Sequence, residues 1–380
     1  MNRRTIVHMD LDTFFVSVER KKNSSLIGKP VIIGGTSDRG VVASCSYEAR
    51  KFGVHSAMPV RMAKSICPSG IYLKGDMEDY SRHSNEVTEI IAAHSPAFEK
   101  ASIDEHYIDI SGMDHFFGSF KWTHELREKI IHETGLPISF GLSTNKTVSK
   151  IATGESKPNG ELEIGYGCEK SFLAPLSIKK IPMIGDKTYK LLRNMGIEKV
   201  YTLQEMPQEV MHMVLGENGN TIWKKANGID NSPVVPYSEQ KSISTETTFD
   251  KDTIDMEQLN QTIIKMVEKL SFQLRSMTKL TSCITIKIRY SDFNTYTHQA
   301  KISYTSSDHV IIPKAKELFN KVFSKRLLIR LVGVKFSGLV EGCQQINLFE
   351  DSTEMINLYQ VMDKMRRRFG NNKIIRAISL

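Results

Sequence analysis

The chain of 380 residues contains only five cysteines and no long apolar run. The cysteines are scattered, odd in number and without a Cys-x-x-Cys pair, so the sequence supports neither a disulfide framework nor a zinc knuckle. Apolar runs such as Val31–Ile33 and Leu327–Ile329 fall far below the roughly 18 residues that span a bilayer. His8 and Asp10 interrupt the apolar core that a signal peptide needs. We therefore expect a cytoplasmic protein that is not in a membrane.

Charges of opposite sign are separated along the chain. Residues 13–75 carry ten lysines and arginines against three acidic residues, whereas residues 76–167 carry eight against sixteen. Residues 236–342 are basic again, with sixteen against eleven. An acidic block between basic blocks suits a carboxylate active site served by surfaces that bind a polyanion. Charged faces that are merely solvated would give the same counts, and charge alone does not name the polyanion.

The first 160 residues alternate between short strands and helices, which predicts a mixed α+β core. A buried strand over Thr5–Met9 ends at Asp10. Asp12 stands where it can cap a helix running from about Thr13 to Lys22. From about residue 167 the pattern changes to short helices.

Beyond the prolines at 233 and 236 the chain becomes rich in strands. Cys283–Tyr290 alternates between apolar and polar residues, which predicts a half-exposed strand with basic side chains on its outer face. A final helix is expected over Met355–Phe369.

Three carboxylates fall at the ends of predicted strands. Asp10 ends the first strand, and Asp104 and Glu105 lie at the turn of a predicted hairpin. Clustered carboxylates disfavour one another's ionised form unless a cation neutralises them. Mg²⁺ binds such oxygens, and substrate phosphates fill its other positions. Acidic residues at strand ends are also common without a metal, so this pattern alone does not decide between the two interpretations.

Three side chains could bind phosphate. Tyr47 and Arg50 are three residues apart and share one face of a predicted helix, where a hydroxyl and a guanidinium can bind phosphate oxygens together. Lys157 precedes the turn sequence Pro158–Gly160. Each could equally be an ordinary surface side chain, but with the carboxylates they supply the parts for triphosphate chemistry.

These residues belong to four longer segments, which are His8–Phe15, Ser46–Val54 with Ala57–Pro59, Ser102–Asp109 and Gly141–Gly160. In residues, order and spacing the four segments resemble the motifs of the Y-family DNA polymerases. The resemblance covers nearly the whole chain and is strongest to a bacterial subgroup.

The resemblance implies an α+β, multi-domain right-hand polymerase with a C-terminal α/β domain. The implied domains are a ferredoxin-like palm (1–12 and 76–166), small fingers (13–75), a helical thumb (167–235), a linker (236–242), a DNA-binding little finger (243–342) and a tail (343–380).

Catalysis is implied for Asp10, Asp104 and Glu105, which with the Leu11 carbonyl would hold two Mg²⁺ ions, with Mn²⁺ as a substitute. The incoming dNTP would be bound by Tyr47, Arg50, Lys157 and Phe14. Phe15 matches the steric gate that packs under the sugar and excludes a 2′-hydroxyl, whereas on periodicity alone it would be a helix core residue.

DNA contacts are implied in two places. Ile181–Thr188 resembles a helix–hairpin–helix turn and offers Gly185, Lys187 and Thr188 to a DNA phosphate, although Met183 stands where the motif usually has glycine. Lys241 opens a segment that resembles the start of the little finger, and binding there should be sensitive to salt.

A further peptide in the tail resembles the motif that docks on the bacterial sliding clamp (the β subunit). In residues 345–349, Leu348 and Phe349 would fill an apolar pocket and Gln345 would orient the strand. The implied partners are therefore primer–template DNA, dNTPs and the clamp, with the chain itself a monomer.

The implied activity is low-fidelity synthesis across damaged templates, because the fingers are small and the small residues Ala43, Ser44 and Cys45 leave space above the templating base. No segment is expected to form a proofreading exonuclease. His106 replaces the alanine that is most frequent in the family, and we assign it no catalytic role.

Three other kinds of protein could share some of these features. A nucleotidyl cyclase would not need the DNA-binding segments, and a metal-dependent nuclease would not need the residues that bind a triphosphate. A non-catalytic DNA- and clamp-binding protein would be expected to lack a carboxylate, and none is missing.

Overall fold

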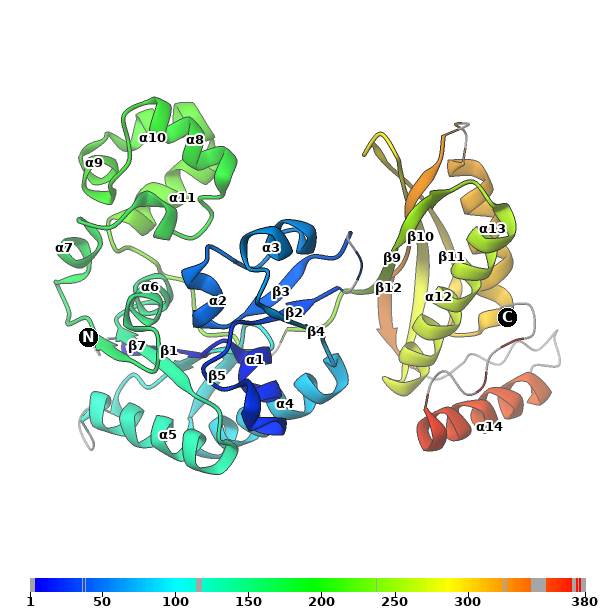
Figure 1. The fold of residues 1–380 in the computed structure, drawn as a ribbon, viewed down its shortest axis with the longest axis horizontal. Coiled ribbons are helices and arrows are strands. Elements are labelled where there is room, and N and C mark those ends of the chain that lie inside the picture. Colours follow the sequence, from blue (N-terminus) through cyan, green and yellow to red (C-terminus); the bar gives the residue numbers. More distant parts are fainter. Residues whose placement is uncertain are drawn as a thin grey trace. The chain divides into compact units, whose positions relative to one another are not determined.

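The computed structural model describes residues 4–35, 37, 39–113, 118–236, 238–323, 325, 327–342, 353–370, 374 and 376. The chain forms two compact units, residues 1–238 and residues 239–380 (Figure 1). No helix in the described ranges is long and apolar enough to cross a lipid bilayer.

The first unit is built on a five-stranded sheet with β1 at its centre. The order is β5 (Ala97–Lys100), β6 (Glu105–Asp109), β1 (Ile6–Leu11), β7 (Ile138–Ser143) and β8 (Glu161–Glu163). β1 runs antiparallel to β6 and β7, and β8 runs parallel to β7. The predicted strand near the N-terminus and the predicted hairpin are both present.

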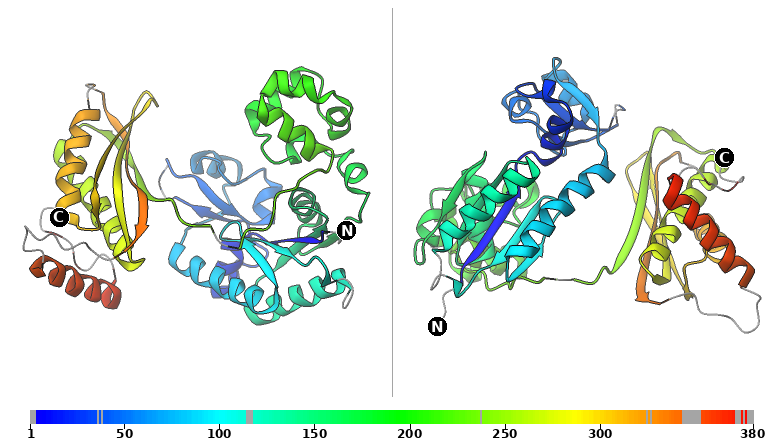
Figure 2. Two further views of the ribbon diagram at one scale, coloured as in Figure 1. Left: turned by 180° about the vertical axis from the view of Figure 1, so that it is seen from behind. Right: turned by 90° about the horizontal axis from the view of Figure 1, so that it is seen from below.

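Helices cover both faces of this sheet (Figure 2). Val7, Met9 and Leu11 share a core with α4 (Met77–His94) and α5 (Ser119–Thr134). The alternate β1 residues face α6 (Lys146–Ser156), whose Ser149 Oγ donates to the Ile6 carbonyl. Gly141 on β7 permits this close packing, because a Cβ there would lie 2.2 Å from the Ser149 carbonyl oxygen.

A smaller three-stranded sheet has the order β3 (Val42–Cys45), β2 (Val31–Gly34), β4 (Ile71–Lys74). It is accompanied by α1 (Phe14–Lys22), η1 (Ser24–Leu26), α2 (Tyr47–Lys51) and α3 (Val60–Ile66). The strands β4 and β8 were not predicted from the sequence. Both are short, only partly buried and paired in parallel with a partner distant in sequence, so neither has a local signature.

The predicted helical segment of the first unit contains α7 (Glu169–Leu173), η3 (Ile178–Lys180), α8 (Asp186–Asn194), α9 (Val200–Glu205), α10 (Gln208–Leu215) and α11 (Glu217–Ala226). Its apolar core gathers residues such as Leu192, Leu203 and Met211, and it continues into α6 through Val148 and Ile151.

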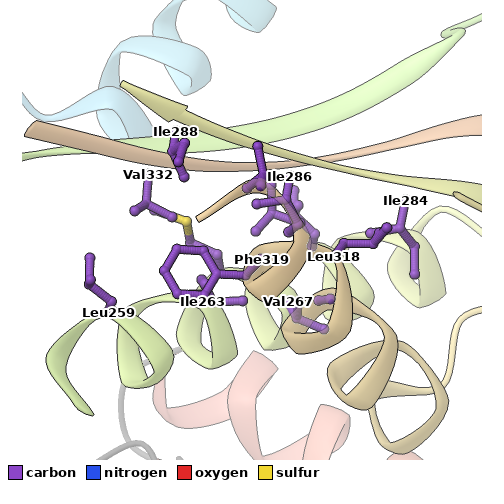
Figure 3. Close-up of a cluster of buried hydrophobic side chains, with 14 of the residues drawn as sticks. Leu259, Ile263, Val267, Ile284, Ile286, Ile288, Leu318, Phe319 and Val332 are labelled. Carbon is purple, nitrogen blue, oxygen red and sulfur yellow. The ribbon is translucent and has the colours of Figure 1, made fainter. Parts of the chain in front are cut away.

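The second unit is an antiparallel sheet in the order β11 (Thr295–Thr305), β10 (Lys279–Tyr290), β12 (Ile329–Glu341), β9 (Ser242–Thr253). It also contains α12 (Met256–Ser276), α13 (Asp308–Val322) and α14 (Thr353–Phe369). In Figure 3 the isoleucines of β10, such as Ile284 and Ile288, point toward Val267 of α12 and Phe319 of α13. Lys287 and Arg289 alternate with them and are only partly buried, which confirms the predicted half-exposed basic strand.

Candidate active site

Two adjacent strand ends bring the predicted carboxylates together. Asp10 on β1 lies directly opposite Glu105 on β6 in antiparallel register. The backbone N–H of Leu11 donates to the carbonyl of Asp104 at 3.0 Å, which fixes Asp104 beside the end of β1. The Asp104 carboxylate accepts a hydrogen bond from Ser102 Oγ at 2.6 Å. All three carboxylates therefore lie at the same end of the neighbouring strands β1 and β6.

A cavity of about 220 Å³ opens at this end of the two strands. Its walls combine the two aspartates with cations and aromatic side chains, and they include Asp10, Leu11, Asp104, Phe14, Phe15, Arg50 and Lys157. Ala43 and Ser44, two small residues of β3, also line it. Residues from the large sheet, from α1, from the small sheet and from the turn after α6 thus share one cavity.

The carboxylates have opposite electrostatic environments. Burial raises the pKa of Asp10 to about 6, and the like charges of Asp104 and Glu105 add to the rise while Lys157 opposes it. The pKa of Glu105 is lowered to about 2 by His8 and Lys150, although burial opposes the shift. Glu105 is therefore anionic at neutral pH, whereas Asp10 is harder to ionise. A cation bound beside both would favour the ionised form of Asp10.

Lysine ammonium groups neutralise both strand-end carboxylates. Lys157 Nζ lies 2.5 Å from Asp10 Oδ1, and Lys150 Nζ on α6 lies 2.5 Å from Glu105 Oε2. His8 is buried beneath Glu105, with Nε2 3.8 Å from its Oε2 and with Nδ1 2.8 Å from Thr153 Oγ1. Sequence reasoning missed Lys150 and His8. The spacing of His8 and Asp10, two residues apart on one strand, places both on the same face and could have revealed His8.

The predicted phosphate-binding pair is preorganised on α2. Ser46 caps this helix by accepting from the Ala49 N–H at 3.2 Å. The Arg50 guanidinium lies 5.3 Å from the centre of the Tyr47 ring, so the two side chains share a helix face as predicted. Burial raises the pKa of the Tyr47 hydroxyl, which therefore stays protonated and can donate a hydrogen bond.

The expectation that Asp12 caps α1 is wrong. Thr13, in a left-handed conformation, precedes the helix, and it makes no side-chain cap. Asp12 is buried instead, with 2% of its surface exposed. Its carboxylate accepts from the Tyr47 hydroxyl at 3.3 Å, from Ser139 Oγ at 2.8 Å and from the Asn159 N–H at 2.6 Å. Three partners distant in sequence thus replace the local cap.

The two phenylalanines of α1 have different surroundings. Phe14 is buried in the core and is also one of the residues that line the cavity. Phe15 is partly exposed and stacks on Tyr80 of α4, with ring centroids 4.3 Å apart. An aromatic ring held in this way at the cavity wall has the rigidity that a steric gate needs.

His106 points away from the cavity. Its imidazole is buried against α4, where Nε2 lies 3.0 Å from Thr88 Oγ1. Burial lowers the pKa of His106 to about 3. These contacts agree with giving His106 no part in catalysis.

A second group of possible metal ligands lies elsewhere, at His124, Glu128 and Glu161. Its carboxylates are already neutralised, because Arg127 Nη1 lies 2.9 Å from Glu161 Oε1 and also contacts Glu128. Asp10, Asp104 and Glu105 offer oxygen ligands only, which suit a hard divalent cation better than a group that includes an imidazole, and Asp10 and Asp104 also line the cavity.

The predicted DNA contacts lie in both units. Gly185 precedes α8, Lys187 is exposed and Thr188 is partly exposed. Met183 has a positive φ of 77°, so it occupies a backbone conformation that favours glycine. Lys241 is exposed just before β9 in the second unit. The predicted clamp residues Gln345, Leu348 and Phe349 lie outside the described residues.

Comparisons with known proteins agree with this geometry. The impB/mucB/samB family matches residues 9–154, and the C-terminal domain of that family matches residues 240–348. A DNA polymerase IV of Dehalococcoides mccartyi is 38% identical over 98% of this chain and 97% of its own length. A DNA polymerase IV of Treponema denticola is 34% identical over 97% of this chain and 95% of its own length.

A solved structure shows the same architecture. A Y-family DNA polymerase chimera of Dbh and Dpo4 superposes with a TM-score of 0.79 at 27% identity, covering 89% of this chain and 100% of its own. The expected α+β right-hand polymerase with a C-terminal little finger is thereby confirmed. The long matches to named polymerases, the shared fold and the carboxylate cavity lead to one conclusion. The chain belongs to the Y family of DNA-directed DNA polymerases.

Proposed function

We propose that the protein adds dNTPs to a primer 3′ end by metal-dependent phosphoryl transfer, with low fidelity, in synthesis across damaged templates. The observation that carries the proposal is the single cavity in which Asp10 and Asp104 face Arg50 and Lys157, with Phe15 in its wall. Anionic side chains can hold metal ions there while cationic ones bind phosphates. Small residues at 43 and 44 leave space above the templating base.

Each group would have a distinct role. Asp10, Asp104, Glu105 and the Leu11 carbonyl would hold two Mg²⁺ ions, which when bound supply charge to activate the 3′-hydroxyl and stabilise the leaving pyrophosphate. Tyr47, Arg50 and Lys157 would bind the triphosphate by hydrogen bonds and charge. Lys157 and Lys150, which contact Asp10 and Glu105, are placed to turn toward phosphate when the carboxylates receive cations.

The domain assignment belongs to the same proposal. We assign the palm to residues 1–12 and 76–166, the fingers to 13–75, the thumb to 167–235, the linker to 236–242, the little finger to 243–342 and the tail to 343–380. The division into two compact units after residue 238 supports a linker at that place. Gly185, Lys187, Thr188 and Lys241 would contact the DNA backbone.

The experiment is primer extension with the purified chain, Mg²⁺ and four dNTPs on an intact template and on one with an abasic site. We expect slow extension on both, with none after chelation and none by Asp104→Ala. Asp109→Ala is the matched control, because Asp109 lies at the other end of β6, where its carboxylate accepts a hydrogen bond from the Ser111 N–H. If the wild type bound primer–template but did not extend it, the non-catalytic hypothesis would replace this one.

A clamp contact through residues 345–349 is a separate part of the proposal, and its support is the sequence Gln-Ile-Asn-Leu-Phe. We infer that a bacterial β clamp increases the length of product that this chain, acting as a cytoplasmic monomer, makes in one binding event. The paired change Leu348→Ala and Phe349→Ala should abolish that increase and leave extension without clamp unchanged. Equal stimulation of the variant would exclude the contact.

A further inference from the structure

Asp12 uses both carboxylate oxygens in a buried position between β1 and α1. Oδ2 accepts from Ser139 Oγ on β7 and from the Asn159 N–H, and Oδ1 accepts from the Tyr47 hydroxyl. A buried carboxylate without partners would destabilise the fold strongly, so these hydrogen bonds are needed to offset the cost of burying Asp12. With both oxygens held by donors from within the fold and only 2% of its surface exposed, Asp12 is not placed to be a metal ligand.

The turn that carries Lys157 is fixed from two sides. On one side, Asp12 accepts from the Asn159 N–H at 2.6 Å. On the other, Arg127 Nη2 donates to the Asn159 carbonyl at 3.1 Å and to its Oδ1 at 2.7 Å. Arg127 is itself held by the Ile138 carbonyl, 2.9 Å from its Nε. The backbone two residues beyond Lys157 therefore has little freedom.

Asp12 also reaches Lys157 directly, because Lys157 Nζ lies 3.7 Å from the same Oδ1 that accepts from Tyr47. Tyr47 comes from α2 beside the small sheet, whereas Lys157 comes from the turn after α6 on the large sheet. One carboxylate oxygen thus sets the spacing between two groups that different parts of the unit supply.

We propose that Asp12 is a positioning residue for the incoming nucleotide, which holds the Tyr47 hydroxyl and the Lys157 ammonium at the spacing needed to bind one phosphate chain. It acts through these two side chains and not by contact with substrate. The inference rests on the proposed function of Tyr47 and Lys157 and adds to it a residue that organises them.

The test is steady-state extension of one primer–template with varied dNTP, comparing the wild type with Asp12→Asn. The amide oxygen can still accept from Ser139 and Asn159, but its NH₂ group would face Tyr47 and repel the Lys157 ammonium. We expect the KM for dNTP to rise about tenfold, the effect of losing one charge-assisted hydrogen bond. We expect kcat to fall less than about threefold and the Kd for primer–template to stay unchanged.

A purely structural role would not couple Asp12 to Tyr47. Tyr47→Phe removes the shared hydroxyl, so Asp12→Asn should raise KM less in that background than in the wild type. Asp109→Asn, which makes the same change to a carboxylate at the other end of β6, should change neither KM nor the coupling. Because Asp12→Asn can also impair folding, thermal unfolding is measured for each variant. Asp12→Glu serves as the second variant, since it keeps the charge but moves the carboxylate, and it should raise KM as well.

The outcomes separate the two proposals. If Tyr47→Phe and Lys157→Gln leave KM unchanged, the proposed nucleotide grip is wrong. If those variants raise KM while the KM of both Asp12 variants stays within twofold of the wild type, nucleotide binding by Tyr47 and Lys157 is supported and the role of Asp12 is refuted. A fall in kcat at constant KM would also refute it, because it would place Asp12 in the chemical step.

Discussion

Phe15 on α1 lies against Tyr80 on α4, with ring centroids 4.3 Å and planes 13° apart. Tyr80 is fully buried, and its hydroxyl donates to Glu19 at 2.8 Å. The ring that we propose as the steric gate is therefore supported from behind by a fixed aromatic surface. Its position depends on this support as well as on α1.

Phe15→Ala should allow ribonucleotides into the cavity, because the ring that would contact a 2′-hydroxyl is removed. We expect the preference for dNTP over rNTP, measured as a ratio of kcat/KM, to fall at least about tenfold. Tyr80→Leu should give a smaller fall by loosening the gate. Tyr80→Phe, which keeps the stacked ring and loses only the Glu19 bond, should leave the ratio unchanged. An unaltered ratio in Phe15→Ala would identify the ring as helix core only.

Buried His106 should make the fold sensitive to mild acid. The pKa of His106 is about 3 in the folded state against 6.5 for an ordinary histidine, so below pH 6.5 the unfolded chain binds a proton that the folded chain does not. Stability is therefore lost as the pH falls, by about 2 kcal/mol between pH 7 and pH 5. Urea unfolding in a buffer with chelator should show that His106→Asn loses less stability over this range. Equal losses in both proteins would place the acid sensitivity elsewhere.

Much of the site follows from local pattern. Strand alternation and a hairpin turn are enough to predict that Asp10, Asp104 and Glu105 each lie at a strand end, since each rule involves neighbours in sequence. The pairing of β1 with β6, which places Asp10 opposite Glu105, joins strands distant in the chain and is implied only by the resemblance to the polymerase family. The same rules fail for Asp12. A capping rule considers only the adjacent helix, whereas the partners Ser139 and Asn159 are 127 and 147 residues away. Tertiary hydrogen bonds to distant donors overrode a weak local preference.

Lys150 illustrates a second limit. The sequence marks it as a polar residue in a helix, and nothing nearby indicates a carboxylate partner. Its contact with Glu105, 45 residues earlier, arises because α6 packs across β1 and over Gly141. Fold class and strand-end carboxylates are thus predictable from the chain alone, while the cations that pair with those carboxylates depend on how helices are placed on the sheet.

Met183 should be replaceable by glycine with a gain in stability. Its φ of 77° is unfavourable for a residue with a Cβ, and its side chain is half exposed. Met183→Gly should raise the free energy of unfolding by up to about 1 kcal/mol, because relief of the left-handed strain exceeds the entropy cost of glycine. Met195, also exposed but with φ of −88°, is the control, and Met195→Gly should destabilise. Thermal unfolding measures both, and a loss in Met183→Gly would show that its side chain packs favourably.

Helix α14 should depend on one buried ion pair for its attachment to the second unit. Arg275 of α12 donates from Nε and Nη2 to the two oxygens of Asp363 at 2.6 and 2.9 Å, and its guanidinium lies 4.6 Å from the Tyr359 ring. Asp363→Ala would leave the largely buried Arg275 guanidinium with Asp308 and the Ser306 carbonyl as partners of Nη1, while Nε and Nη2 would lose their acceptors. Breaking such a pair costs about 3 kcal/mol.

Hydrogen exchange should therefore be faster throughout α14 in Asp363→Ala, while β10 and β12 keep their protection. Lys364→Gln changes the next residue, whose side chain is exposed, and should leave exchange in α14 as it is in the wild type. If Asp363→Ala exchanged no faster, the apolar contacts of Tyr359 would hold the helix by themselves. Because α14 follows residues 345–349 in the chain, primer extension with a clamp tests whether the proposed clamp peptide requires an anchored helix after it. If it does, the clamp should stimulate extension by Asp363→Ala less than extension by Lys364→Gln.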